Sequence, residues 1–340
     1  MTHVRSRVSN AMKEKKSFTF ADLFAGIGGM RFAYEQVGGQ CVLTSEINEQ
    51  ARVTYRAQNW KFDHPDHKYI DDVVVLGDLP KSKIPQHDVL LAGFPCQPYS
   101  IAGLRQGLED EKGRGQVFLS ILDILKKAQP KAFMLENVKG MLSHDGGRTV
   151  AFMCDELAKK GYDVFKPTVL NSMTHGGVPQ NRERVFIVGF RRDLGPVNFS
   201  FPKEIGLKQT LQQKLESNKV ADKYFYDDRY ECFAEIKAAV KSSNTAYQWR
   251  RKYVRENKSN VCPALTANMG SGGHNVPLVK VQNGIRKLTP RECANLQGFP
   301  QSFVIPAGMA DVHLYHQFGN SVTVPLIQRI ANKIASALPE

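Results

Sequence analysis

The chain has 340 residues, of which 42% are hydrophobic and 23% are charged, as in an ordinary folded globular protein. These values exclude a largely disordered chain, a collagen-like fibre and a coiled coil, and no apolar run is long enough to predict a membrane span. Lys and Arg outnumber Asp and Glu by 46 to 33, which gives a formal net charge of +13. Such a surplus favours binding to polyanions such as nucleic acid, but it also fits a generally basic protein.

The six cysteines are spread along the chain, with no Cys-x-x-Cys pair and no Cys/His cluster of zinc-binding spacing. We therefore expect reduced thiols, no metal site and a location in the cytoplasm. Residues 1–16 are basic and lack the apolar segment of a secretory signal, so we interpret them as a basic N-terminal arm.

From residue 18 to residue 190, short apolar runs alternate with amphipathic stretches. This alternation predicts an α/β fold with a doubly wound, mostly parallel sheet, whose ligands bind at the carboxyl ends of the strands. The expected strands are 18–24, 41–45, 88–93, 132–135 and 185–190, and the expected helices are 31–37, 49–58, 116–128 and 149–160.

After residue 190 the chain becomes polar and its apolar periodicity weakens, which predicts a second, smaller, irregular or β-rich domain. Within it, residues 241–260 hold six basic residues and one acid, with Tyr247, Trp249 and Tyr253 among them. Residues 325–338 return to helical periodicity, and we expect this helix to pack back on the first domain.

The first strand runs into a glycine-rich turn, with Gly26, Gly28 and Gly29, and Glu46 follows Gly26 by 20 residues. Glycines at a strand-to-helix turn allow close approach of a ligand, and the acid is where such folds bind a ribose diol. Because the spacing is Gly-x-Gly-Gly and not the Gly-x-Gly-x-x-Gly of a pyrophosphate cradle, S-adenosylmethionine fits better than NAD. The alternative is a tight structural turn with a solvated acid.

Three further positions carry side chains suited to catalysis. Cys96 lies between Pro95 and Pro98 at the end of a strand, which favours a nucleophile over a buried structural thiol. Glu136 ends another expected strand and is predicted to face the same crevice, the alternative being a helix cap. Arg182 and Arg184 are two residues apart on an extended segment, so they point the same way and suit an anionic or carbonyl-rich object; the alternative is a charged edge strand.

Six motifs occur in the order found in the DNA cytosine-5 methyltransferase family, and the chain from about residue 18 to 334 resembles the prokaryotic restriction-modification members. They are Phe-Ala-Gly-Ile-Gly-Gly at 24–29, Gly-Phe-Pro-Cys-Gln at 93–97, Glu-Asn-Val at 136–138, Gln-Asn-Arg-Glu-Arg at 180–184, Arg-Lys-Leu-Thr-Pro-Arg-Glu-Cys at 286–293 and Gln-Phe-Gly-Asn-Ser-Val at 317–322. Two features depart from the family: Pro98-Tyr99 stands where some members carry Ala-Phe, and Ala264-Leu265 stands where Thr-Leu is common.

The resemblance implies a methyl transfer from S-adenosylmethionine, with S-adenosylhomocysteine as product, to C5 of a cytosine flipped out of double-stranded DNA. It implies that 17–194 with 314–340 form the cofactor-binding catalytic domain and that 195–313 form the target-recognition domain and hinge. The implied catalytic residues are Cys96, which adds to C6, and Glu136, Arg182 and Arg184. The implied cofactor-binding residues are Phe24, Ala25, Gly26, Ile27, Gly28, Gly29, Glu46, Ile47, Asp78, Leu79, Pro95, Asn320, Ser321 and Val322.

The DNA-binding residues that we expect lie in the loop after the cysteine and in the basic and glycine-rich parts of the smaller domain. They are Gln97, Ser100, Arg105, Arg250, Arg251, Lys252, Arg255, Asn268, Ser271 and His274. We expect a monomer, and a cognate restriction endonuclease that acts on the same site without having to bind this protein. Two alternatives stay open: a tRNA cytosine-5 methyltransferase on the same scaffold, and an inactive DNA-binding relative.

Overall fold

The structure, a computed structural model, describes residues 17–60, 63–95, 114–217, 219–257, 259–271 and 275–339. Several sequence predictions lie outside these residues. They are the N-terminal arm 1–16 and the candidate site residues Cys96, Gln97, Ser100, Arg105 and His274.

An eight-stranded sheet forms the centre of the larger part of the molecule, with strand order β3-β2-β1-β4-β5-β9-β6 and β7 paired to β9. The first five strands in this order, β3, β2, β1, β4 and β5, are mutually parallel, whereas β9 runs antiparallel to β5, β6 and β7. The sheet is therefore mixed and mostly parallel, which confirms the predicted fold class. The strands are β1 (Phe18–Leu23), β2 (Gly39–Ser45), β3 (Asp63–Tyr69), β4 (Val89–Gly93), β5 (Ala132–Val138), β6 (Tyr162–Val164), β7 (Thr168–Asn171) and β9 (Glu183–Arg191).

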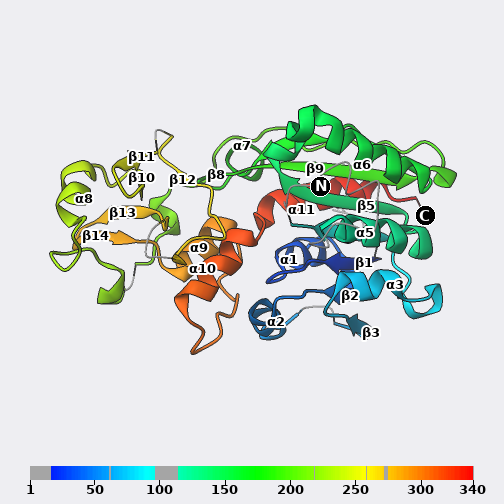
Figure 1. Ribbon diagram of the computed structural model, residues 1–340, viewed down its shortest axis with the longest axis horizontal. Helices are drawn as coiled ribbons and strands as arrows, with labels where there is room; N and C mark the ends of the chain where they lie inside the picture. The colour runs from blue at the N-terminus through cyan, green and yellow to red at the C-terminus, as the bar shows by residue number, and fades with distance from the viewer. Residues whose placement is uncertain are drawn as a thin grey trace, which may run out of the picture.

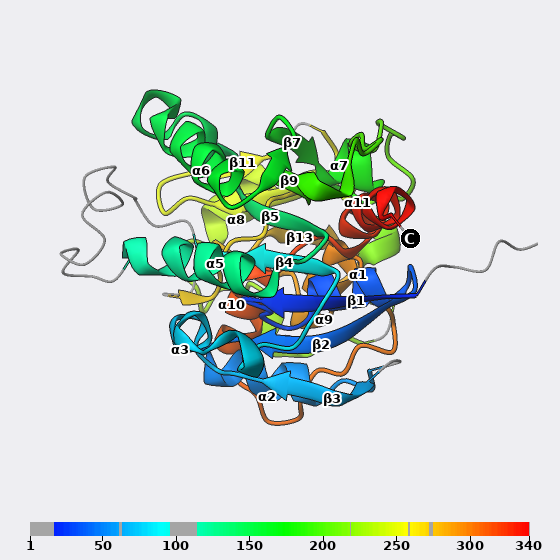
Figure 2. The ribbon, with the colours of Figure 1, turned by 90° about the vertical axis from the view of Figure 1, so that its right-hand side faces the viewer.

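Helices cover both faces of this sheet, and Figure 2 shows α5 and α6 on one side and α1 and α11 on the other. One apolar core packs β-strand side chains against α1, α2 and α11, and the other packs them against α3, α5 and α6. The helix at the C-terminus thus returns to the first part of the chain. These helices are α1 (Gly29–Glu35), α2 (Glu49–Arg56), α3 (Val73–Asp78), α5 (Arg114–Ala128), α6 (Arg148–Lys159), α7 (Ser172–Gly176) and α11 (Val324–Ala337).

A smaller antiparallel sheet, in the order β11-β10-β13-β14, lies at the opposite end of the molecule with α8 against it (Figure 1). Between the two sheets, α9 and α10 pack together, and β8 pairs with β12. The segment that reads as irregular in the sequence therefore contains short strands. These elements are β8 (Gln180–Asn181), α8 (Phe233–Ala239), β10 (Ala246–Trp249), β11 (Val254–Glu256), β12 (Cys262–Pro263), β13 (Leu278–Val281), β14 (Gly284–Lys287), α9 (Pro290–Gln297) and α10 (Asp311–Asn320).

The helices among the described residues include none that is both long enough and apolar enough to cross a membrane.

Candidate active site

The turn after β1 brings an open glycine next to a carboxylate. Phe24 and Gly26 both have a φ of 56°, and a Cβ built on Gly26 would meet nothing within 4 Å. The Gly26 N–H donates to Glu46 Oε2 at 2.8 Å, and the Asn48 N–H donates to Glu46 Oε1 at 2.7 Å. Since β1 and β2 are parallel neighbours, both turns lie at the same edge of the sheet, and two backbone donors fix the Glu46 carboxylate there.

The other two glycines of this turn serve packing. A Cβ on Gly28, where φ is 84°, would lie 2.3 Å from the Trp60 ring. A Cβ on Gly29 would lie 2.9 Å from the side chains of both Ser321 and Val322. The glycine-rich turn therefore combines one residue that leaves room for a ligand with two that admit neighbouring side chains.

A cavity of about 420 Å³ opens at the carboxyl ends of β1, β2, β4 and β5, a volume in the range of small-molecule sites. It contains side chains of four kinds: apolar groups, amides, the imidazole of His316, and the charged groups of Glu46, Glu136 and two arginines. Its described lining is Phe24, Gly26, Glu46, Ile47, Asn48, Ala51, Gly93, Phe94, Pro95, Glu136, Asn137, Val138, Arg182, Arg184, His316, Gln317, Gly319 and Asn320.

Nine residues predicted from the sequence line this cavity, and eight of the predicted cofactor-binding residues do not. Asp78 is exposed at the end of α3 and Leu79 follows it, away from the described lining. Ala25 is buried and its N–H donates to Ser45 O. The eight residues that are absent from the described lining are Ala25, Ile27, Gly28, Gly29, Asp78, Leu79, Ser321 and Val322.

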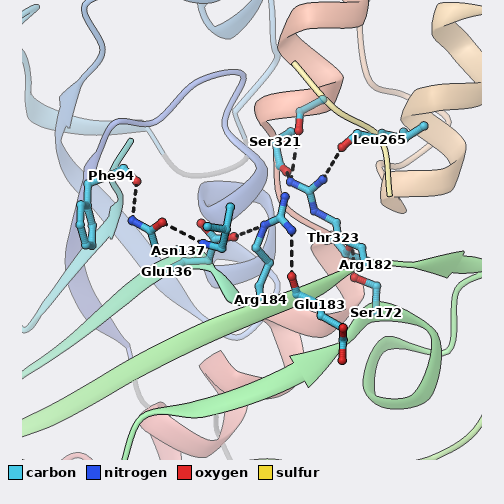
Figure 3. Close-up of polar contacts among 12 residues, drawn as sticks. Phe94, Glu136, Asn137, Ser172, Arg182, Glu183, Arg184, Leu265, Ser321 and Thr323 are labelled. Carbon is cyan, nitrogen blue, oxygen red and sulfur yellow. Dashed lines mark hydrogen bonds and ion pairs between the residues drawn. The ribbon is translucent and has the colours of Figure 1, made fainter. Parts of the chain in front are cut away.

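Glu136 and Arg184 form an ion pair in the wall of the cavity (Figure 3). Glu136 lies on β5 and Arg184 on β9, and the two strands are antiparallel neighbours in which Val138 pairs with Arg184. This register places the two side chains close together. Arg184 Nε lies 3.0 Å from Glu136 Oε1, and Arg184 Nη1 donates to Glu183 O at 2.8 Å. The N–H of Nε is not aimed at Oε1, so this buried oxygen has no hydrogen-bond donor within the described part of the chain. Its hydrogen-bonding capacity is therefore unused by these residues.

The end of β4 is held against β5 by a side chain. The Asn137 Nδ2 donates to the carbonyl of Phe94 at 3.0 Å, and Gly93 pairs with Glu136 across the two strands. Pro95, the next residue, lines the cavity. The chain thus leaves β4 beside Glu136 immediately before Cys96.

Arg182 does not form a clamp together with Arg184, contrary to the prediction from their spacing. It is 2% exposed, and its guanidinium donates to main-chain carbonyls of Leu265, Gly319 and Ser321 (Figure 3). The physical reason is the break between β8 and β9 at this residue, which lets the two side chains diverge. Arg182 therefore does bind a carbonyl-rich object, but that object is the chain itself.

Sequence reasoning missed several residues in the lining. His316 lies one helical turn before Asn320 on α10, and the two side chains are 3.3 Å apart at Asn320 Nδ2 and His316 Nε2. The i, i+4 spacing from Asn320 would have placed His316 on the same helix face. Asn48 was missed as well, although it caps α2 directly after Glu46.

The comparisons with known proteins agree with this geometry. A family profile described as C-5 cytosine-specific DNA methylase matches residues 18–336. The chain belongs to this family. It is a DNA cytosine-5 methyltransferase.

The methyltransferase is similar to bacterial relatives over nearly its whole length. It is 46% identical over 321 residues to the Type II methyltransferase M.Bsp6I of Bacillus sp. (strain RFL6), covering 94% of this chain and 98% of that one. It is 39% identical to the Type II methyltransferase M.HpaII of Haemophilus parainfluenzae, covering 95% and 91%. Its fold is similar to that of the S. pombe Dnmt2 methyltransferase, with a TM-score of 0.71, 19% identity and coverage of 94% and 98%.

The smaller part of the methyltransferase has a polar cavity of about 360 Å³, called here the recognition cavity. Three predicted DNA-binding residues line it, namely Arg250, Arg255 and Asn268. In the described part of the chain, no hydrogen bond or ion pair engages the guanidinium of Arg250 or Arg255, and both residues are exposed. The other lining residues are Asn181, Gln248, Asn257, Pro263, Ala264, Thr266 and Asn275.

The remaining predicted DNA-binding residues that the structure describes lie near the recognition cavity but outside its lining. Arg251, with a φ of 65°, and Lys252 are exposed in the turn between β10 and β11. Ser271 is exposed three residues after Asn268. Among the described residues of the methyltransferase, no group of three or more His, Cys, Asp or Glu side chains could hold a metal ion.

Proposed function

We propose that this methyltransferase transfers the methyl group of S-adenosylmethionine to C5 of a cytosine flipped out of a short, specific duplex site. The observation that carries the proposal is that Glu136 and Arg184 line the same cavity as Gly26 and Glu46. A carboxyl group suited to catalysis and a nucleoside-sized recess thus share one space. The relatives named Type II methyltransferases support the same reaction and a role in a restriction-modification system.

The described residues of the cavity fit S-adenosylmethionine. The Gly26 main chain leaves room for close approach, and both Glu46 oxygens, oriented by main-chain donors, have lone pairs left for the two hydroxyls of a ribose. Phe24 and the 68% exposed Ile47 offer apolar surface to the adenine ring, and Asn320 lines the same cavity. When bound, the cofactor supplies an electrophilic methyl group on its sulfonium.

Cys96 is the proposed nucleophile. Cytosine C5 is too weak a nucleophile to attack a methyl group unaided, and addition of a thiolate to C6 turns the ring into an enamine whose C5 can attack. Methyl transfer leaves C5 with both a proton and a methyl group, so a base must then remove the C5 proton, and the C5–C6 double bond re-forms as the Cys96 thiolate leaves C6. The hydrogen bond between Asn137 and Phe94 supports this role, because it fixes the residues immediately before Cys96 at the rim of the cavity.

Glu136 is proposed to act in its protonated form and to donate a hydrogen bond from its carboxyl group to N3 of the cytosine ring, and Arg184 to contact that carboxyl and the flipped base. General-acid assistance of this kind contributes about 10²- to 10⁴-fold to a rate. Flipping the base out of the duplex costs a few kcal/mol, so contacts made only with the extruded base are needed to offset it.

The recognition cavity is proposed to face the duplex. Its amides and guanidinium groups are the side chains that pair with base edges in the major groove, whereas the lysine and arginine at the tip of the β10–β11 turn suit phosphates. We assign residues 17–194 with 314–340 to catalysis and 195–313 to recognition and the hinge, as the sequence predicts. We further propose a monomeric, cytosolic enzyme whose cognate endonuclease cleaves the same site when it is unmethylated.

Bisulfite sequencing of plasmid DNA from cells that express the protein tests this function. Methylated cytosines confined to one short sequence are expected, and the Cys96→Ser variant is expected to leave the plasmid unmethylated. An unmethylated plasmid despite soluble wild-type protein would reject the proposal and direct the search to an RNA cytosine substrate.

A further inference from the structure

Arg182 lies between the recognition cavity and the cofactor cavity. Its neighbour Asn181 lines the first, and Arg182 itself lines the second. Its Nη1 donates to Leu265 O at 2.7 Å, whereas its Nη2 donates to Gly319 O at 3.2 Å and to Ser321 O. One guanidinium therefore joins two segments that are more than fifty residues apart in the sequence.

The first segment forms a wall of the recognition cavity. Ala264 and Thr266, on either side of Leu265, both line that cavity. The main chain of Leu265 is held at both polar groups, because its N–H donates to Gln180 Oε1 at 3.1 Å while its carbonyl accepts from Arg182. Side chains of β8 and of the residue after it thus fix this wall.

The second segment forms a wall of the cofactor cavity. The two carbonyls that Arg182 binds belong to the residues on either side of Asn320, and Gly319 and Asn320 line the cavity. A Cβ on Gly319 would lie 2.2 Å from the main chain of Thr266, so the two walls are in direct backbone contact. A shift of one wall must therefore move the other or break the contacts of Arg182.

Burying this charge is unfavourable. No carboxylate lies within ion-pair distance of Arg182 in the described residues, and its Nε has no hydrogen-bond partner there. Burial, reinforced by the nearby charge of Arg184, lowers the pKa of Arg182 well below its usual value. A neutral side chain would avoid that penalty. What an arginine offers in return is a planar guanidinium whose two Nη groups donate to both walls at once.

We infer that Arg182 is a positioning residue that holds the recognition wall and the cofactor wall in register, and so links DNA binding to cofactor binding. The inference rests on the proposed function, since it requires that the two cavities take DNA and S-adenosylmethionine. When the duplex orders the segment around Leu265, Arg182 transmits that order to the carbonyls that flank Asn320. Linkage then requires the cofactor to strengthen DNA binding by the same factor.

The test measures the dissociation constant of S-adenosylhomocysteine by calorimetry, with and without a duplex that carries the site mapped by bisulfite sequencing. This product cannot donate a methyl group, so binding is read without turnover. In the wild type the duplex is expected to tighten binding by a factor within the usual range of about 5- to 150-fold. In Arg182→Lys, which keeps a long side chain with an amine donor but loses the fork, that factor is expected to fall toward one.

Arg184→Lys is the matched control, since it alters the other arginine of the same motif, which contacts Glu136 and neither wall segment. It is expected to lose methyl transfer and to retain the linkage. If Arg182→Lys does not fold in thermal denaturation, Gln180→Met, which leaves the Leu265 N–H without its acceptor, tests the same wall and is expected to lower the factor.

A wild-type factor of one, or an unchanged factor in a folded Arg182→Lys or Gln180→Met variant, would overturn the inference. If the wild type methylates the plasmid but the linkage is insensitive to these variants, only the role of Arg182 fails. If the wild type does not methylate DNA, the proposed function fails and this inference fails with it.

Discussion

Arg184 Nε lies 3.0 Å from Oε1 of Glu136, yet that oxygen receives no hydrogen bond from the described residues. The guanidinium thus lies beside the carboxyl without donating a hydrogen bond to this oxygen. An ion pair whose purpose was only structural would be expected to satisfy this buried oxygen, because an unpaired buried acceptor costs about 1–3 kcal/mol. The arrangement is one that a bound base would complete.

Replacement of Glu136 by Gln tests this arrangement. The amide keeps the size of the side chain but cannot supply a proton to N3, so kcat is expected to fall by about 10²- to 10⁴-fold while the affinity for S-adenosylhomocysteine is unchanged. Glu183→Gln is the control, since that exposed carboxylate pairs with Lys139 and its backbone contact to Arg184 remains. Transfer of a labelled methyl group to plasmid DNA gives the rates, and equal rates for the two variants would remove Glu136 from the chemistry.

How much of this site the sequence could predict depends on how local each contact is. The turn from Phe24 to Gly29 and the strand end at Glu136 were predicted because each is a property of a few neighbouring residues. The binding of main-chain carbonyls by Arg182 was not, because its acceptors at 265, 319 and 321 come together only in the folded chain. The same holds for Ser321 and Val322, whose side chains pack against the start of α1.

The fold shows the same division. The five core strands of the larger sheet were predicted from their apolar runs, since burial on both faces leaves a strong signal. Strand β3, Asp63–Tyr69, was missed because it is a polar edge strand with a proline at position 65. The short strands of the smaller sheet were missed because neither their length nor their alternation stands out from the surrounding polar chain.

Glu46→Gln tests the ribose contact. The Glu46 carboxylate accepts hydrogen bonds from two N–H groups, one at each oxygen. Gln has only one acceptor oxygen, so its NH₂ group would face the second N–H and that hydrogen bond would be lost. We expect the affinity for S-adenosylhomocysteine to fall about tenfold, the equivalent of about 1.4 kcal/mol, as for the loss of a hydrogen bond to a charged group. Calorimetry measures it, with Glu49→Gln as the control because that exposed residue lies one turn away at the start of α2. Unaltered binding in Glu46→Gln would exclude the ribose assignment.

Substitution of Gly28 and Gly26 by Ala separates packing from ligand access. Both glycines have a positive φ, so each variant incurs about 1–2 kcal/mol of backbone strain. The Cβ on Gly28 also meets Trp60, whose ring is held by Arg31 and Phe32, and this overpacking adds about 1–3 kcal/mol. Urea unfolding is expected to show Gly28→Ala as the less stable, whereas Gly26→Ala is expected to bind S-adenosylhomocysteine more weakly. The opposite order of stability would contradict the assignment.

Arg255 and Lys252 are expected to behave differently toward DNA. Arg255 lines the recognition cavity, so Arg255→Ala should weaken binding to the specific duplex by about 1–3 kcal/mol and reduce discrimination against a scrambled one. Lys252 lies in the exposed β10–β11 turn, so Lys252→Ala should weaken binding to both duplexes alike. It should also reduce the slope of the logarithm of the binding constant against the logarithm of the salt concentration by about one. Titrations of the two duplexes at several salt concentrations measure both effects, and uniform weakening in Arg255→Ala would assign that residue to phosphate instead.

Asp22 is expected to make stability depend on pH. Its carboxyl is fully buried in β1, and desolvation raises its pKa to about 7. The charges of Glu46 and Glu35 add to this shift, whereas the charge of Arg31 and a hydrogen bond from its main chain oppose it. Between its ordinary pKa near 3.8 and about 7, the folded protein therefore holds a proton that the unfolded chain has released. The contribution of Asp22 to stability is fully present below that range and is lost as the pH rises through it, by up to about 1.4 kcal/mol per pH unit.

Asp22→Asn removes this titration while preserving the shape of the side chain. Urea unfolding of the wild type and of Asp22→Asn from pH 5 to pH 8 measures the effect as a difference, so that other titrating groups cancel. We expect the variant to gain stability relative to the wild type as the pH rises toward 7, and the difference to level off above it, where Asp22 is ionised in both states. A difference that is constant across this range would mean that Asp22 is already ionised in the folded protein at pH 5, and that Arg31 outweighs the desolvation of its carboxyl.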